Sequence, residues 1–444
     1  MMEYKEFKEA LFKEAIAKGC EAAEAYYVRG EAFSVNVLKG EMEQYEVNRG
    51  NGLNLRVSLG GKDGYAYTEA LADPEGLVAR AMDNARAIEN EDDHPMQGKS
   101  TYPKLERPER KCDSLTEREK IELAGKLEKA MLAADKRVER AMYSAVESDS
   151  REIFISNTLG LDAHGERRSV DCLAMPVTRE GDDVRNKFSF RVGDEIFDYE
   201  TCAKEAVAET VALHGAAPVS AGKYKVLIRN DAMGDMLSAF SSMFSAEAAQ
   251  KGLSLLKDKT GESIASSSIS IIDDPLMADN PREFDDEGVP SVKTTVVENG
   301  VLRSFLHNLK TAKKAGVPST SNGGRAGVAS PVDIMPSNFY IAAGSASFEE
   351  MVNELCDGLI ITDVSGLHAG LNPVSGEFSL IAQGRLVSGG KIVRPVDQIT
   401  VAGSFMELMQ SVETVGSDLR FGPSGGARIG SPSLLIKELT ISGK

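Results

Sequence analysis

The run at residues 366–384, GLHAGLNPVSGEFSLIAQG, places a histidine, two serines and a carboxylate in one glycine-rich segment. Together with Asp363, His368 and Ser375 supply the three side-chain types of a serine hydrolase, in which an imidazole takes the proton of a hydroxyl nucleophile. The run contains no G-x-S-x-G motif, which would present such a serine on a sharp turn. Ser375-Gly376 is also typical of the turn in a hairpin. Nucleophilic catalysis and a structural hairpin both remain open here.

The sequence gives only weak signals for a metal site or a phosphate-binding loop. The five histidines are far apart in the sequence and form no pair at helical spacing. The acidic run Asp285-Asp286-Glu287 could hold a hard cation weakly, but it reads more simply as a loop before a hairpin turned at Glu298-Asn299-Gly300. The glycine-rich segments 323–331 and 422–432 match neither a P-loop nor a dinucleotide-binding fingerprint. We therefore expect no dedicated metal or nucleotide site.

Composition narrows the class of protein further. The 444 residues carry a formal net charge of −17, which repels phosphate backbones and argues against direct nucleic-acid binding. The five cysteines are odd in number and include no C-x-x-C pair, as in a protein of a reducing compartment. No segment approaches the length of a membrane span, and the N-terminus lacks the apolar core of a signal peptide. We expect a cytoplasmic protein without membrane contact.

The elements that would position these residues predict an α+β fold in three parts. Residues 1–95 read as a helix at 4–18, several alternating strands, and a helix that begins at Asp73-Pro74. Residues 112–217 begin with a capping box at Ser114 and Glu117 and continue into a long helix, strands and a helix at about 200–213. Residues 222–444 contain a strand, a helix at 231–250 and many further strands. We expect a mixed or antiparallel N-terminal sheet with helices, and a large C-terminal mixed β-sheet domain that carries the cavity.

Several short motifs occur in one order and together resemble the PmbA/TldE branch of the TldD/PmbA family, whose members are also labelled modulators of DNA gyrase. The motifs are RGNGLNLRV at 49–57, GYAYT at 64–68, DDP at 273–275, FDDEGVP at 284–290, NGVL at 299–302, Pro336 with Asn338, GLHAGLNPVSGEFS at 366–379 and GSPSLLIKEL at 430–439. The resemblance implies a two-subunit cytosolic metalloprotease that acts on unfolded peptides or peptide precursors. In such an assembly the TldD-type subunit carries zinc on an HExxxH helix and a cysteine, and the TldE-type subunit is its non-catalytic companion.

The ligand positions can be located by anchoring the HExxxH helix on Gly252. The two histidine positions then fall on Leu237 and Ser242, and the glutamate position falls on Ser238. A leucine has no donor atom, and a serine hydroxyl replaces neither an imidazole ligand nor a carboxylate base. No cysteine follows Cys356. The resemblance therefore implies no catalytic residue and no metal in this chain, with zinc in a TldD-like partner.

Three functions follow from this reading. The first is the non-catalytic subunit of a heterodimeric metalloprotease. In that case the glycine-rich run forms a rim that binds extended peptide through His368, Asn372, Ser375, Gly376 and Glu377. The second is a homodimeric peptide-binding or regulatory protein without protease activity, since a chain lacking its partner commonly pairs with itself. The third is an independent hydrolase that uses residues 363–379.

Overall fold

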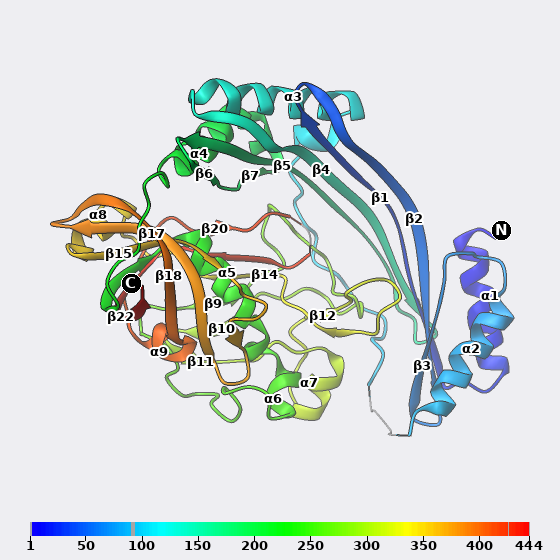
Figure 1. The fold of residues 1–444 in the computed structure, drawn as a ribbon. Coiled ribbons are helices and arrows are strands. Elements are labelled where there is room, and N and C mark those ends of the chain that lie inside the picture. Colours follow the sequence, from blue (N-terminus) through cyan, green and yellow to red (C-terminus); the bar gives the residue numbers. More distant parts are fainter. Residues whose placement is uncertain (1, 90–93, 425, 444) are drawn as a thin grey trace.

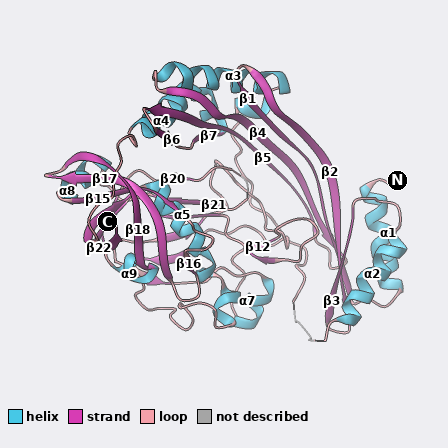
Figure 2. Ribbon diagram, viewed as in Figure 1, coloured by secondary structure: helices cyan, strands magenta, loops and turns pink. Residues whose placement is uncertain are grey.

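The computed structural model describes residues 2–89, 94–424 and 426–443. An arch of long antiparallel strands, flanked by helices, curves around a C-terminal body of shorter strands and helices (Figure 1). Helices and strands alternate without regular helical crossovers (Figure 2), which confirms the predicted α+β class. Residues 90–93, near the end of the first predicted part, lie outside the described residues.

The arch is one seven-stranded sheet with the order β3-β2-β1-β4-β5-β6, and β7 pairs with β5. Its strands are β1 (Ala22–Leu38), β2 (Glu41–Leu59), β3 (Lys62–Thr68), β4 (Val138–Asn157), β5 (Asp162–Glu180), β6 (Asp183–Asn186) and β7 (Ser189–Val192). Strand β1 pairs with β4 from Glu24–Asn157 to Asn36–Ala145. The strands of the first two predicted parts therefore share one continuous sheet.

Two pairs of helices cover the two ends of the arch on the same face. Helices α1 (Tyr4–Ala17) and α2 (Pro74–Ala87) pack near Tyr27, whereas α3 (Glu117–Ala134) and α4 (Tyr199–Val211) pack near Phe33. Tyr27 and Phe33 point to one face because side chains alternate along a strand. The Asp73 side chain accepts the N–H of Gly76 at 2.9 Å and begins α2, as predicted. The short 3-10 helices η1 (Lys111–Ser114) and η2 (Gly193–Asp198) complete this half.

The C-terminal body contains two larger sheets. In the first, the order β15-β8-β22-β18-β17-β16 closes on itself because β15 also pairs with β17, and β19 pairs with β22. Its strands are β8 (Gly222–Ile228), β15 (Gly358–Ser365), β16 (Leu371–Asn372), β17 (Glu377–Ser388), β18 (Lys391–Ser404), β19 (Val412–Val415) and β22 (Leu434–Ser442). The second sheet has the order β11-β10-β9-β14-β21-β20. Its strands are β9 (Ile271–Asp273), β10 (Thr294–Glu298), β11 (Val301–Leu302), β14 (Asn338–Ile341), β20 (Arg420–Phe421) and β21 (Arg428–Ser431).

The largest hydrophobic core of the described chain lies in this body and includes Phe240, Phe244, Phe339 and Phe405. The remaining elements are α5 (Asn230–Phe240), η3 (Ser241–Phe244), α6 (Ala246–Gln250), α7 (Leu309–Ala315), α8 (Phe348–Leu355), α9 (Phe405–Gln410) and the small pair β12 (Gly323–Gly324) and β13 (Asp333–Ile334). The predicted turn is confirmed, because Asn299 and Gly300 have φ of 47° and 81° between β10 and β11. Helix α5 connects this core with the cavity described below.

Two sequence predictions of local structure were wrong. The single helix expected at 231–250 is broken, because η3 tightens the chain after Phe240 and the Ser245 side chain caps α6 by accepting the N–H of Ala248 at 3.4 Å. The capping box expected at Ser114 and Glu117 lies two residues later, at Thr116 and Glu119. None of the described helices is long and apolar enough to cross a membrane.

Candidate functional site

A cavity of about 760 Å³ lies where the arch meets the C-terminal body. Its walls come from the β6–β7 connection, α4, α5, β15, β17 and the segment around β20. On the arch side the lining includes Lys187, Phe188, Ser189, Phe190, Glu205, Ala208 and Glu209. On the side of the body it includes Arg229, Asn230, Asp231, Asp235, Ser238, Thr362, Asp363, Arg385, Asp418, Arg420 and Phe421. Charged groups of both signs and aromatic rings therefore face one space.

Helix α5 presents one polar side to this cavity. Asp231, Asp235 and Ser238 line it at spacings of four and three residues, which places them along one face of a helix. The start of α5 is held by the body, because the Asn230 N–H donates to Ser433 Oγ at 3.1 Å. Leu237 points elsewhere and is fully buried in the main core. The helix thus separates a packing side from a cavity side.

Ion pairs organise the floor of the cavity. Arg229 contacts Asp231 at 2.6 Å and Glu209 at 2.9 Å, and Arg385 contacts the same Glu209 carboxylate at 3.0 Å. Burial by itself would lower the pKa of Arg229, but the hydrogen bonds and charges of Asp231 and Glu209 outweigh it and raise that pKa. Lys187 forms a further ion pair with Asp363. These contacts join α4 of the arch to β17 and α5 of the body.

A second contact closes the cavity between the same two halves. The Arg420 side chain donates to the carbonyl oxygen of Phe190 at 3.2 Å, and its guanidinium lies 4.8 Å from the centre of the Phe190 ring. A guanidinium over an aromatic ring is attracted by the negative face of the ring. Both residues line the cavity. The wall is therefore built from parts of the chain that are 230 residues apart.

Asp235 has the chemically distinctive carboxyl of this cavity. Burial raises its pKa to about 6, and the nearby charges of Asp231 and Asp363 act in the same direction. Lys187 opposes this increase. A carboxyl with this pKa takes up and releases a proton near neutrality, so Asp235 is suited to general acid–base exchange or to binding a cationic group.

The residues present do not fit a zinc centre. In the described part of the chain, no three His, Cys, Asp or Glu side chains are grouped so that they could hold a metal ion. Of the three positions that the resemblance assigns to the HExxxH motif, Leu237 lies in the core, Ser238 lines the cavity and Ser242 lies exposed in η3. Zinc sites in proteins use imidazole, thiolate and carboxylate donors, which these side chains lack. Zinc chemistry therefore cannot be assigned to these residues.

The glycine-rich run forms the β16–β17 hairpin, outside the lining of the cavity. The Asn372 side chain accepts the N–H of Val374 at 2.9 Å, and the Asn372 carbonyl accepts the N–H of Gly376 at 2.8 Å. Gly376 has a φ of 73°, which glycine adopts without strain. His368, Asn372 and Glu377 are exposed, and Ser375 is half-buried. Peptide binding by these five residues remains a prediction.

The three side chains of the hydrolase hypothesis have separate surroundings. Asp363 lies in the cavity and pairs with Lys187, whereas Ser375 supports the hairpin turn through the N–H of Glu377 at 3.4 Å. No hydrogen bond connects His368 with Ser375 or Asp363 among the described residues. The arrangement that activates a serine requires those two hydrogen bonds. The hairpin interpretation accounts for the contacts, and the triad does not.

The acidic run at 285–287 is buried and occupied by protein donors. Asp285 accepts the N–H groups of Glu287 and Val289, both at 3.0 Å, and of Gly323 at 2.8 Å. Glu287 accepts the N–H of Leu309 at 2.8 Å and contacts His94 Nε2 at 2.5 Å. Burial, together with the charge of Glu287, raises the pKa of Asp285 to about 8. These carboxyl groups fix loops of the body to the arch, and the weak divalent site remains without support.

Sequence reasoning missed most of the cavity. Lys187, Glu209, Arg229 and Arg385 lie on four separate elements, and no short motif connects them. The one local signal was the spacing of Asp231 and Asp235, which places two carboxylates on one face of the predicted helix. The glycine-rich segment 422–432 contributes Gly422 and Pro423 to the wall, although residue 425 lies outside the described chain.

Models of one protein family match three successive segments of the chain. Residues 23–85, 110–213 and 221–443 match, in that order, domain 1, the central domain and the C-terminal domain of the PmbA/TldA metallopeptidases. The chain is 25% identical over 441 residues to a protein named metalloprotease PmbA from Escherichia coli O157:H7, covering 96% of this chain and 93% of the other.

Solved structures show the same fold. A Thermotoga maritima protein named as a modulator of a DNA gyrase has a TM-score of 0.89 and 34% identity, covering 99% of this chain and all of that one. TldE from Thermococcus kodakarensis also has a TM-score of 0.89, at 23% identity, covering 98% of this chain and all of that one. With the family models covering more than half of its residues, the chain belongs to the PmbA/TldD metallopeptidase family.

Proposed function

We propose that this chain is the non-catalytic, TldE/PmbA-type subunit of a cytoplasmic heterodimeric metalloprotease that acts on unfolded peptides or peptide precursors. The observation that carries the proposal is helix α5. The HExxxH positions on this helix hold Leu237 in the core and Ser238, and the last of them holds Ser242 in η3. A chain that keeps the family's three domains without the donors for zinc is suited to shape and contact rather than to bond cleavage.

The relatives support a partnership of two kinds of chain. Other members that match this sequence are named TldD homologues, including one from Haemophilus influenzae that is 28% identical over 358 residues. A TldD-like partner would supply zinc and the general base. This chain would then contribute binding surface, with the β16–β17 hairpin offering backbone and side-chain groups to an extended peptide. All five cysteines are free, in keeping with a reducing compartment.

The proposal is tested by isolating the chain from its native host and analysing what accompanies it. We expect a TldD-like chain with an HExxxH motif to co-purify, and we expect zinc to follow that chain rather than this one. Elemental analysis of this chain alone, after dialysis, should find well under one zinc per molecule. One tightly held zinc per isolated chain would contradict the proposal, because the present donors do not suit that metal.

A homodimeric peptide-binding or regulatory role is the second candidate. Its support is the edge of β2 along residues 41–51, which borders β1 on one side and no other strand of the described chain on the other. The independent hydrolase at 363–379 is not proposed, because its side chains are engaged separately.

A further inference from the structure

The cavity between the arch and the body contains one carboxylate without a partner. Asp235 lines this cavity and is exposed to it, and its side chain makes no hydrogen bond or ion pair with another residue of the described chain. The other carboxylates of the lining all accept hydrogen bonds or ion pairs from protein groups, namely Glu205, Glu209, Asp231, Asp363 and Asp418. Asp235 is therefore the acidic group of this cavity that a ligand can engage without breaking an existing contact.

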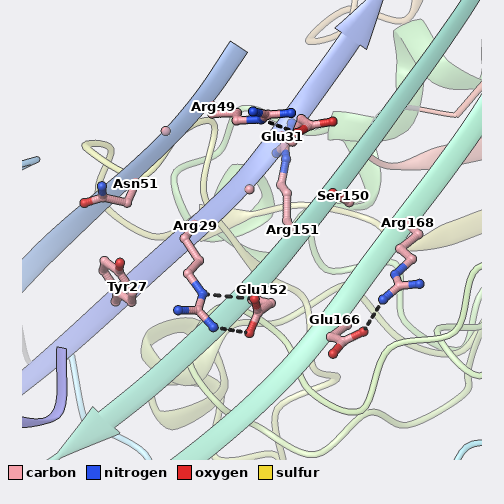
Figure 3. Close-up of a pocket in the computed structure, with 12 residues that line it drawn as sticks. Tyr27, Arg29, Glu31, Arg49, Asn51, Ser150, Arg151, Glu152, Glu166 and Arg168 are labelled. Carbon is pink, nitrogen blue, oxygen red and sulfur yellow. Dashed lines mark hydrogen bonds and ion pairs between the residues drawn. The ribbon is translucent and has the colours of Figure 1, made fainter. Parts of the chain in front are cut away.

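A shallower cavity on the arch shows the opposite condition. It has a volume of about 490 Å³ and lies on the face of β1, β2, β4 and β5 (Figure 3). Each carboxylate among the described residues of its lining is paired with an arginine: Glu152 with Arg29 at 2.8 Å, Glu31 with Arg49 at 2.5 Å, and Glu166 with Arg168 at 3.1 Å. The two cavities therefore differ in the acidic charge that they leave for a ligand.

The surroundings of Asp235 favour a positively charged ligand. Burial, and after it the charges of Asp231 and Asp363, raise the pKa of Asp235, because they make its negative charge less favourable. Neighbouring negative charges that strengthen the binding of a proton also strengthen the binding of any other cation at the same place. Lys187 is not available as that cation, because its ammonium is paired with Asp363 and donates to the Thr362 carbonyl oxygen at 3.3 Å.

The available donor atoms favour an organic cation over a metal ion. Within the described part of the chain, no three His, Cys, Asp or Glu side chains are grouped so that they could hold a metal. Ser238 lies three residues after Asp235 on the same side of α5, and its exposed hydroxyl makes no hydrogen bond with the described chain. A carboxylate and a hydroxyl at this spacing can accept two hydrogen bonds from one ammonium or guanidinium group.

Apolar side chains line another part of the same cavity. Phe188 and Ile392 are 40% and 47% exposed, although both belong to the lining. The Phe188 ring lies 6.1 Å from the Phe190 ring, centre to centre, and Phe190 already has the guanidinium of Arg420 over its own face. The exposed Phe188 ring can therefore pack against an aliphatic stem or attract a cation. A cationic end group on an aliphatic stem matches both parts of the lining.

We propose that this cavity binds a basic side chain of an unfolded peptide, with the cationic group on Asp235 and Ser238 and the aliphatic stem along Phe188. The inference rests on the proposed function only for the nature of the ligand, an unfolded peptide. The net charge of −17 would attract such a peptide from a distance. A free amino terminus carries the same ammonium chemistry, and the experiment below separates the two sources.

Calorimetric titration of the isolated chain with short peptides at low salt tests this site without a protease partner. The probe is a five-residue alanine peptide with a central lysine, acetylated and amidated at its ends. The matched control has norleucine in place of lysine, which keeps the aliphatic stem and removes the charge. We expect the lysine peptide to bind at least about tenfold more tightly, because a hydrogen bond to a charged group is stronger than a neutral one. A norleucine peptide with a free amino terminus should bind as weakly as the acetylated one.

Variants then locate the binding site. Asp235→Asn should weaken binding of the lysine peptide about tenfold or more, and Phe188→Ala should weaken it about two- to fivefold. Asp182→Asn removes the same charge from the exposed turn between β5 and β6 and should leave binding intact. Circular dichroism confirms that each variant is folded.

Three outcomes would overturn the inference. The first is equal binding of the lysine and norleucine peptides to the native chain, which decides the matter even if a variant does not fold. The second is a folded Asp235→Asn chain that binds the lysine peptide as tightly as the native chain. The third is tight binding of the norleucine peptide with a free amino terminus, which would assign the site to chain ends. A TldD-like chain that co-purifies while neither peptide binds would contradict this inference alone and leave the proposed function standing.

Discussion

Leu237 and Ser238 are neighbours on α5 but face different surroundings. Leu237 is fully buried among the aromatic and aliphatic side chains of the main core, whereas Ser238 lines the cavity beside Asp231 and Asp235. The position that would carry a histidine ligand by resemblance is thus a packing position here. The chain thus keeps the helix of the metallopeptidase family, but the helix packs Leu237 into the core at a position where the resemblance places a zinc ligand.

Truncation of the two neighbours should therefore have unequal effects. Leu237→Ala leaves a cavity in a closely packed core and should lower the free energy of unfolding by about 2–5 kcal/mol. Ser238→Ala removes a hydroxyl that faces the cavity and should change it by less than about 0.5 kcal/mol. Urea unfolding followed by circular dichroism measures both. Equal destabilisation by the two changes would contradict the assignment of the helix faces.

Asp235 should give the stability of the protein a pH dependence between about pH 4 and 6. Its pKa is raised to about 6 in the folded chain, above its value in the unfolded chain, so the folded state binds the proton more tightly. The stability that this group contributes is therefore fully present below about pH 4 and is lost as the pH rises from there through about 6. Asp235→Asn should flatten the curve of unfolding free energy against pH in this window.

The control for this experiment is Asp182→Asn, a change in the exposed turn between β5 and β6. It should retain the native pH profile. If Asp235→Asn also retained it, the burial and charge repulsion argued for Asp235 would be wrong.

Glu209 should contribute more to the stability of the protein than its partly exposed position on α4 suggests. Its carboxylate neutralises Arg229 and Arg385 together, and Glu209→Gln would leave two guanidinium groups facing one neutral amide. We expect a loss of about 1–3 kcal/mol in unfolding free energy, reduced by high salt because the carboxylate is partly solvated. Glu200→Gln, on the same helix and exposed, should change it by less than about 0.5 kcal/mol. A Glu209→Gln protein as stable as the native chain would contradict the bridging role.

The hairpin should behave as a binding rim. In a reconstituted two-chain protease, His368→Ala or Ser375→Ala should reduce peptide cleavage by roughly tenfold or less, as expected for one lost hydrogen bond. Removal of a nucleophile or base would cost several orders of magnitude instead. Steady-state rates on an unstructured peptide distinguish the two. A loss beyond a thousandfold in a folded variant would support the hydrolase hypothesis that the contacts of Asp363 and Ser375 disfavour.

Local signals predicted local structure well. Asp73 with Pro74 predicted the start of α2, and Asn299-Gly300 predicted the turn between β10 and β11, because these residues act through their own backbone. The break after Phe240 was missed because the apolar spacing continues across it while Ser245 begins a new helix.

Contacts between distant segments could not be predicted in this way. The β1–β4 pairing joins residues more than 100 positions apart, and Arg229, Arg385 and Glu209 meet only after the arch and the body have folded together. The same holds for His94 and Glu287, which are 193 positions apart. Side-chain type and spacing along the chain contain no information about such pairs, so the cavity emerged only from the structure.

The most direct test of the central claim is to assay this chain, a TldD-like chain and their mixture on one unstructured peptide and one folded protein. The account predicts that this chain alone cleaves neither substrate. The mixture should form a stable complex and cleave the unstructured peptide faster than the TldD-like chain alone, while the folded protein stays intact. The account would be contradicted if this chain cleaved peptide by itself in a zinc-dependent manner, or if it neither bound nor stimulated the TldD-like chain.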